Sequence, residues 1–153
     1  MIRPNSVWTL SEIERFLGEQ RIPIRLACLT PRGGPIVCSL WYLYADSALW
    51  CATQKNARIV RYLTEHPLCG FEIAPESPPY KGVRGQGRAT FSKERGADVL
   101  LHLIDRYLGG SDSEFARWLM ARGDNEVAIR IEPTWLSSWD FSNRMQGPGS
   151  SAS

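Results

Sequence analysis

Residues 35–63, PIVCSLWYLYADSALWCATQKNARIVRYL, decide the fold that the sequence predicts. Two apolar, aromatic-rich runs in this stretch, Pro35–Tyr44 and Ala48–Thr53, have the composition of strands. Only Ala45, Asp46 and Ser47 separate them, and so short a link between two strand-like runs is typical of a hairpin. We therefore expect an antiparallel pair of strands here.

A short helix is expected directly after the second run. Asn56 is a candidate N-cap, because its side-chain oxygen can accept a hydrogen bond from a free backbone N–H of the first turn. Ile59, Val60 and Leu63 have the spacing of one buried helical stripe.

Three cations surround the start of this helix: Lys55, Arg58 and Arg61. The free N–H groups of a helix N-terminus already favour an anion, so the cluster suggests a phosphate site. The alternative is a solvated face on which Arg58 or Arg61 pairs with Glu65. The charges by themselves leave both interpretations open.

The rest of the chain predicts a mainly β domain over residues 1–143 and a flexible tail over 144–153. Gly82–Phe91 is a strand whose glycines indicate a bulge. Ser92 is expected to cap the helix that follows it, and Gly109 and Gly110 are expected to end that helix. The other expected elements are a helix after the capping box of Thr9 and Glu12, strands over Ile22–Thr30 and Leu68–Ala74, a helix from Ser111 or Ser113 to about Arg122, and a strand over Glu126–Glu132 that Pro133 interrupts and Thr134–Phe141 continues. About six strands with short turns indicate a small antiparallel barrel or a sandwich.

Composition excludes several classes of protein. A net charge of +2 over 153 residues is too small to favour a nucleic acid as partner. The longest apolar run is far shorter than a membrane span, and the N-terminus has no apolar signal region, so we expect a cytoplasmic protein. Metal-ligand spacing is absent, and four buried free thiols are expected: Cys28, Cys38, Cys51 and Cys69.

An ordered series of motifs resembles the pyridoxamine-5'-phosphate-oxidase-like flavoproteins. A W-Y strand, a tight turn, the strand LWCAT and a basic helix starting with A-R follow one another as they do in that family. The resemblance extends over about Ser11 to Asp140 and includes IPIRLACLTPRGGPIV upstream, and GVRGQGRATF and IRIEPTWLSSWDF downstream.

This resemblance implies a six-stranded antiparallel split β-barrel of the Greek-key, FMN-binding type. It also implies a homodimer with FMN at the interface. The flavin ring would follow Val37, Cys38, Ser39, Leu40, Trp41 and Tyr42. Ala52 and Thr53 would lie near the ribityl chain and phosphate, and Arg58 and Lys55 would hold the phosphate. Trp135 or Trp139 would reach the flavin of the partner subunit.

The sequence also departs from the family pattern. Ile59 stands where a lysine commonly follows the phosphate arginine, and Gly82 stands where the true oxidases have a glutamine that contacts the ring. The substrate-binding Arg and His of those oxidases have no counterpart near the C-terminus. We therefore do not assign the reaction of those oxidases. The resemblance still implies an FMN-dependent oxidoreductase that acts on a small organic substrate. A deazaflavin-dependent reductase, or a flavin- or haem-binding carrier or sensor, is the alternative.

Overall fold

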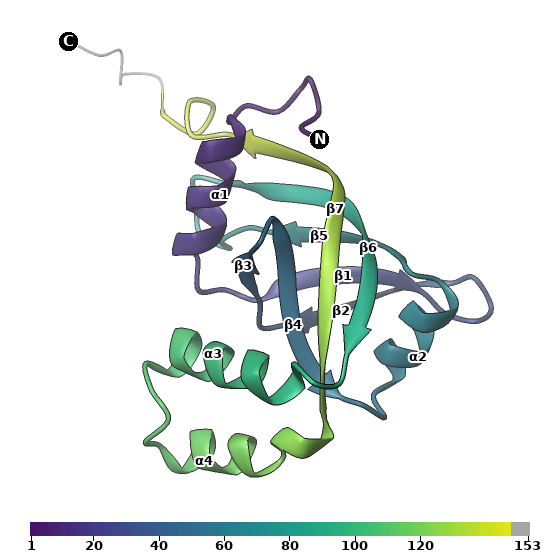
Figure 1. Cartoon of the computed structure of the whole chain (residues 1–153). Helices are drawn as coiled ribbons and strands as arrows, with labels where there is room; N and C mark the ends of the chain where they lie inside the picture. Colours follow the sequence, from purple (N-terminus) through teal and green to yellow (C-terminus); the bar gives the residue numbers. More distant parts are fainter. Residues whose placement is uncertain (148–153) are drawn as a thin grey trace.

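A seven-stranded antiparallel sheet organises the chain in a computed structural model that describes residues 1–147 (Figure 1). The strands are β1 (Ile24–Leu29), β2 (Pro35–Leu40), β3 (Leu43–Ala45), β4 (Ala48–Gln54), β5 (Leu68–Ile73), β6 (Lys81–Ser92) and β7 (Glu126–Asp140). They lie across the sheet in the order β2-β1-β5-β6-β7-β4-β3. The prediction of a mainly β fold with flanking helices is confirmed, but the prediction of six strands is wrong.

The extra strand arises because Pro35–Tyr44 is not one strand. The chain leaves β2 after Leu40 and enters β3 at Leu43, at the opposite edge of the sheet. The hairpin is formed by β3 and β4, with Ala45 paired to Ala48 across a tight turn. Asp46 and Ser47 in this turn have φ of 52° and 55°. Two central residues with positive φ match the twist of the flanking strands.

Tertiary contacts cause the break between β2 and β3. The Tyr42 side chain is fully buried, and its hydroxyl donates a hydrogen bond to the Leu17 carbonyl oxygen at 2.9 Å. The Trp41 ring stacks on Tyr107, with 5.0 Å between the ring centroids. Each of these aromatic side chains has its partner on a helix, and the chain bends to reach both.

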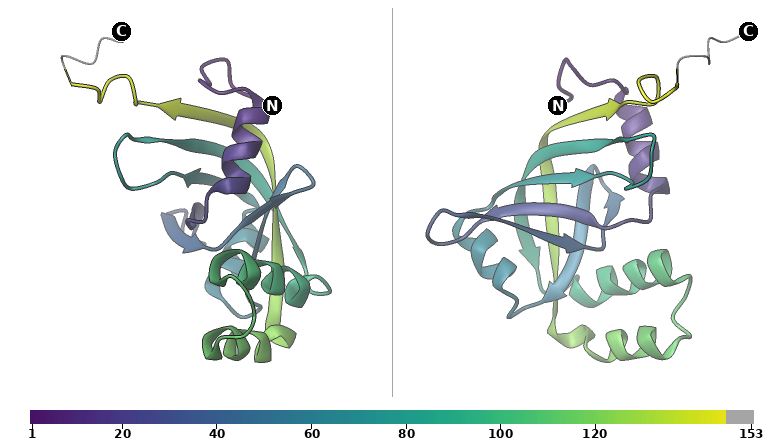
Figure 2. Two further views of the ribbon diagram at one scale, coloured as in Figure 1. Left: turned by 90° about the vertical axis from the view of Figure 1, so that its left-hand side faces the viewer. Right: turned by 180° about the vertical axis from the view of Figure 1, so that it is seen from behind.

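Only two residues, Trp41 and Tyr42, connect the two edge strands β2 and β3. So short a link requires the edges to lie close together, and the sheet therefore curls (Figure 2). Within residues 1–147 no ladder of hydrogen bonds connects β2 with β3. The result is a curled half-barrel with a seam between its edges, and not a closed barrel.

Helices cover the sheet. α1 (Leu10–Glu19) and α2 (Arg58–Glu65) pack on the core inside the curl, to which Ile13, Leu17 and Leu63 contribute fully buried side chains. α3 (Gly96–Leu108) packs outside, over Ala48 and Trp50 of β4, and α4 (Glu114–Ala121) lies beside α3. A 3-10 turn, Gly123–Asn125, leads into β7.

Several local predictions are confirmed. Thr9 and Glu12 form the capping box of α1, and Ser113 caps α4. Gly109 ends α3 in the left-handed conformation, with φ of 72°. The β6–β7 ladder shifts register between Gln86 and Gly87, opposite Pro133 and Trp135, which is the expected bulge.

Two predicted caps are wrong. α2 begins after Ala57, with no side-chain cap, because hydrogen bonds from Lys55 N to Asn125 O and from Ala57 N to Gln54 O keep Asn56 in a turn. α3 begins after Arg95, whereas Ser92 is the last residue of β6.

The four cysteines are free, as predicted, but only three of them are buried, because Cys38 is half-buried at the edge strand β2. Burial raises the pKa of the Cys38 thiol to about 11, so the thiol stays protonated near neutral pH. The predicted tail includes Met145, whose sulfur accepts a hydrogen bond from the Tyr80 N–H at 3.3 Å, and residues 148–153, which lie outside the described residues.

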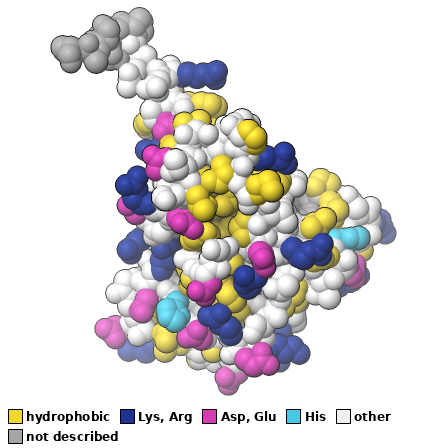
Figure 3. Space-filling model, turned by 45° about the horizontal axis from the view of Figure 1, so that its top comes forward, with side chains coloured by type: hydrophobic (Ala, Val, Ile, Leu, Met, Phe, Trp, Pro, Cys, Tyr) yellow, Lys and Arg dark blue, Asp and Glu magenta, His cyan; other side chains and the backbone are white. Residues whose placement is uncertain are grey.

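None of the helices within residues 1–147 is long and apolar enough to cross a membrane. Basic and acidic side chains are interspersed over the face of the molecule shown in Figure 3.

Candidate functional site

A groove lies outside the curled sheet, where the end of β2 approaches β4. It has a volume of about 330 Å³, and we call it the β2–β4 groove. Its lining residues are Ser39, Leu40, Trp41, Ala52, Thr53, Gln54, Leu100, Leu103, Phe115, Leu119 and Glu126. Five of the residues that the resemblance assigned to the cofactor are among them, from two segments that are not neighbours in the sheet.

The apolar wall of the groove comes from α3 and α4. Leu100 and Leu103 are buried on α3, and Leu119 packs from α4 against the cluster that contains Leu100. The Phe115 side chain is 51% exposed at the groove. Sequence reasoning missed this wall, because an amphipathic pattern shows which helix face is apolar but not which strand it covers.

The polar end of the groove is an amide–carboxyl pair on neighbouring strands. Gln54 Nε2 donates a short hydrogen bond to Glu126 Oε1, and the two residues are paired in the β4–β7 ladder. Glu126 is 9% exposed, and its Oε2 has no hydrogen-bond partner among the described residues. Burial raises the pKa of the Glu126 carboxyl, although the hydrogen bond from Gln54 and the charge of Arg122 act to lower that pKa.

Sequence reasoning also missed Glu126, since a carboxylate at the start of a strand is usually solvated. A β-carbon on Gly96 would lie 2.1 Å from the Glu126 carbonyl oxygen, so the first turn of α3 packs directly on this backbone. Gly96, at the start of the helical pattern, was the local signal that the helix backbone approaches another segment closely.

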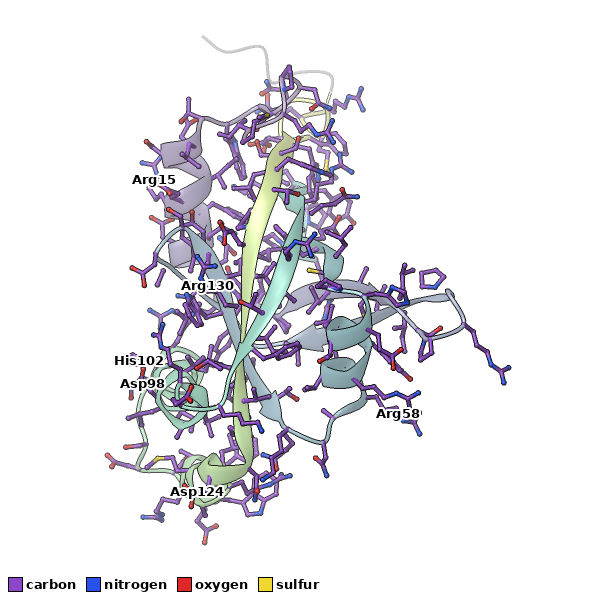
Figure 4. The ribbon with its side chains drawn as sticks, turned by 45° about the vertical axis from the view of Figure 1, so that its right-hand side comes forward. Arg15, Arg58, Asp98, His102, Asp124 and Arg130 are labelled. Carbon is purple, nitrogen blue, oxygen red and sulfur yellow. The ribbon has the colours of Figure 1, made fainter. Side chains whose placement is uncertain are left out.

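The predicted cation cluster lies just beyond the end of β4. Arg61 Nε lies 3.3 Å from Glu65 Oε1. This is the ion pair that the alternative of a solvated face predicted for Arg58 or Arg61. Lys55 and Arg58 are exposed, and neither makes an ion pair within residues 1–147. Arg58 points away from the sheet at the start of α2 (Figure 4). Because Ala57 offers no side-chain cap, the first N–H groups of α2 have no side-chain acceptor.

The other residues from the resemblance lie outside the groove. Val37 is 63% exposed on the outer face of β2, whereas Cys38 is half-buried and contacts the core. Tyr42 is in the core itself. Trp139 is near the end of β7, far along this strand from Glu126 (Figure 1).

Trp139 also explains the glycine at position 82. The two residues are paired in the β6–β7 ladder, and a β-carbon on Gly82 would lie 2.7 Å from Trp139 Cη2 and 2.8 Å from the Ile73 carbonyl oxygen. Packing therefore leaves no room at position 82 for the family's glutamine side chain.

Comparisons with known proteins identify the fold. No family model matches the chain, and no curated protein does. Among solved structures, a conserved hypothetical protein from Mycobacterium tuberculosis is 24% identical, with a TM-score of 0.79 over 99% of both chains. A protein described as an F420 reductase is 22% identical, with a TM-score of 0.69 over 80% of this chain and 94% of the other. A FAD-binding protein from Mesorhizobium loti is 20% identical, with a TM-score of 0.63 over 86% of this chain and 94% of the other. The chain thus shares a split-barrel-like fold with these proteins.

Proposed function

We propose that this chain is a homodimeric flavoprotein oxidoreductase that binds FMN across the β2–β4 groove. One observation carries the proposal: the fold brings Ser39, Leu40 and Trp41 together with Ala52 and Thr53 along one groove. The resemblance assigns the same five residues to the cofactor.

The groove suits a flat, largely apolar ligand. Its walls are mainly aliphatic and aromatic, and a few polar groups lie at one end, which is the usual composition of a cofactor site. Its volume of about 330 Å³ is near the lower limit for such sites, so one protomer would cover only part of the cofactor. A partner subunit would cover the rest.

The chain's own residues would bind and orient the cofactor. Trp41, held by its stack on Tyr107, and Phe115, which is 51% exposed, present apolar surface to it. Lys55, Arg58 and the free N–H groups of α2 would hold a phosphate. A bound flavin supplies hydride or electron transfer, for which the protein provides position and electrostatics.

A deazaflavin is the second candidate cofactor. Ile59 removes one of the two adjacent cations that the FMN phosphate meets in the family, and one similar structure is named for F420, which is a deazaflavin. A haem carrier is supported less well, since neither histidine lines the groove. His102 Nδ1 lies 2.9 Å from the Asp98 carbonyl oxygen, on the exposed side of α3 (Figure 4).

Titration of the purified protein tests this proposal. FMN should quench tryptophan fluorescence, and a concentration about 100 times the dissociation constant should stabilise the protein by about 2.7 kcal/mol, which a thermal shift reveals. F420 and haemin are titrated in parallel. If only F420 binds, the second candidate replaces the first; if no cofactor binds, the proposal of a flavoprotein fails.

The aromatic residues around the β3–β4 hairpin offer little surface for a homodimer interface. Tyr42 and Trp50 are buried by their own chain, at 0% and 5% exposure, and Trp41 and Tyr44 are half-buried. The exposed apolar surface lies instead on the outer face of β1, β2 and β5. Val37 and Leu68 are 63% and 59% exposed there, and Leu68 lines a depression together with Leu29 and Pro35.

Placing a charge on this face should produce monomers. We expect Leu68→Glu to shift the protein from dimer to monomer at micromolar concentration, because a carboxylate in an apolar interface loses its hydration. Light scattering measures the change. Leu101→Glu, at an exposed apolar position on α3, is the matched control and should leave the mass unchanged. A monomeric wild-type protein would refute the dimer.

A further inference from the structure

A second pocket lies on the outer face of β6 and β7, away from the β2–β4 groove. It has a volume of about 210 Å³, and its lining residues are Arg3, Asn5, Arg84, Trp135 and Ser137. We call it the Arg3–Arg84 pocket. These residues come from the N-terminal segment, β6 and β7, so only the folded chain brings them together.

The N-terminal segment that carries Arg3 is fixed to β7. Arg3 N donates to the Leu136 carbonyl oxygen at 2.8 Å, and Leu136 N donates to the Met1 carbonyl oxygen at 2.9 Å. Ile2 and Leu136 form a parallel β-bridge. Arg3 is therefore held at the pocket by backbone hydrogen bonds, although it lies close to the start of the chain.

Both arginines in the pocket are oriented by tryptophan rings. The Arg3 guanidinium carbon lies 4.5 Å from the centroid of Trp135, and that of Arg84 lies 4.8 Å from the centroid of Trp139. Stacking occupies the face of a guanidinium and leaves the N–H groups at its edge free to donate.

No negative charge in the pocket balances these two cations. None of its five lining residues is acidic, and neither arginine makes an ion pair within residues 1–147. Glu72 is paired with Arg84 across the β5–β6 ladder, but the two side chains form no ion pair. Two unpaired guanidinium groups at one pocket favour an anion between them.

Ser137 supplies a third donor to the pocket. The residue lines the pocket, and its hydroxyl makes no hydrogen bond with another described residue. Its oxygen is not among the buried side-chain atoms without a partner, so the hydroxyl is open to the pocket and free to donate. An oxygen atom of a bound anion would accept its hydrogen bond.

We propose that Arg3, Arg84 and Ser137 form a binding site for the phosphate or carboxylate group of a small molecule. Two arginine forks and a hydroxyl provide the donors that either oxyanion requires. The site does not depend on the proposed flavin, because none of its residues lines the β2–β4 groove.

Nuclear magnetic resonance can test the site with simple anions. Inorganic phosphate and acetate are titrated separately at constant ionic strength, while the indole N–H signals of Trp135 and Trp139 are followed. We expect a saturable shift of both signals with at least one of the two anions. The anion that causes it tells phosphate recognition from carboxylate recognition, and no saturable shift with either anion would overturn the site.

Variants then separate a built site from general surface charge. Arg84→Gln and Arg3→Gln should each weaken the binding of the anion at least about 10-fold, as expected for the loss of charge-assisted hydrogen bonds. Arg88→Gln is the matched control, because Arg88 is exposed on the same strand and lies outside the pocket. An equal loss in Arg88→Gln would show diffuse attraction and would refute the proposal.

Discussion

Replacing Arg106 with methionine is expected to lower the free energy of unfolding by about 3 kcal/mol, the scale of two charge-assisted hydrogen bonds. The Arg106 guanidinium donates to the Gly18 carbonyl oxygen at 2.8 Å, to that of Leu17 at 2.9 Å, and to that of Gln20. These carbonyl groups end α1 and have no partner within their own helix. Their partial negative charge adds to the attraction.

Arg106 also joins α1 to the rest of the molecule. Its guanidinium carbon lies 5.1 Å from the Tyr42 ring centroid and 5.8 Å from that of Tyr107. Burial raises the pKa of Tyr42, so its hydroxyl stays a donor to the Leu17 carbonyl. One arginine on α3 thus holds the end of α1 and the aromatic link between β2 and β3.

Thermal and urea unfolding measure this effect. For a chain of this length, a loss of about 3 kcal/mol corresponds to a fall in Tm of roughly 6–12 °C. Arg106→Lys should recover part of the loss, since an ammonium group keeps the charge but not the planar fork. Arg117→Met, at an exposed position on α4, should change the stability by less than about 0.5 kcal/mol. Equal stabilities of Arg106→Met and Arg117→Met would contradict this account.

Replacing Arg58 with alanine is expected to weaken the binding of FMN about 10- to 150-fold and to leave the binding of riboflavin almost unaffected. The physical reason is the phosphate, which only FMN carries: a charge-assisted hydrogen bond to it contributes roughly 1.5–3 kcal/mol. Lys55→Ala should show the same selectivity with a smaller effect, because a lysine offers a point charge. Ile59→Lys should strengthen the binding of FMN, because it adds a second cation beside Arg58 at the start of α2.

The structure supplies a matched control for this experiment. Arg61 is on the same helix but is paired with Glu65, so Arg61→Ala should change neither affinity appreciably. Fluorescence titration of each variant with both ligands measures the difference. Equal losses of FMN and riboflavin in Arg58→Ala would place the phosphate elsewhere.

Several predictions from local chemistry agreed with the structure, although the caps at Asn56 and Ser92 did not. The capping box at Thr9, the cap at Ser113 and the left-handed Gly109 depend on contacts within a few residues. The bulge opposite Pro133 follows from a missing N–H and from glycines in the partner strand. That Ser39–Trp41 and Ala52–Thr53 lie at one groove could be predicted only from the resemblance, because no local pattern relates the two segments.

By itself the sequence determined the strand and helix types and the apolar faces, because spacing and side-chain chemistry act over a few residues. Only the tertiary structure decided where β2 ends, because Trp41 and Tyr42 find their partners on α3 and α1. It also decided that Glu126 faces a groove and that Arg3 meets Arg84. Burial and unpaired charge depend on segments far apart in the chain, and no local pattern records how those segments pack.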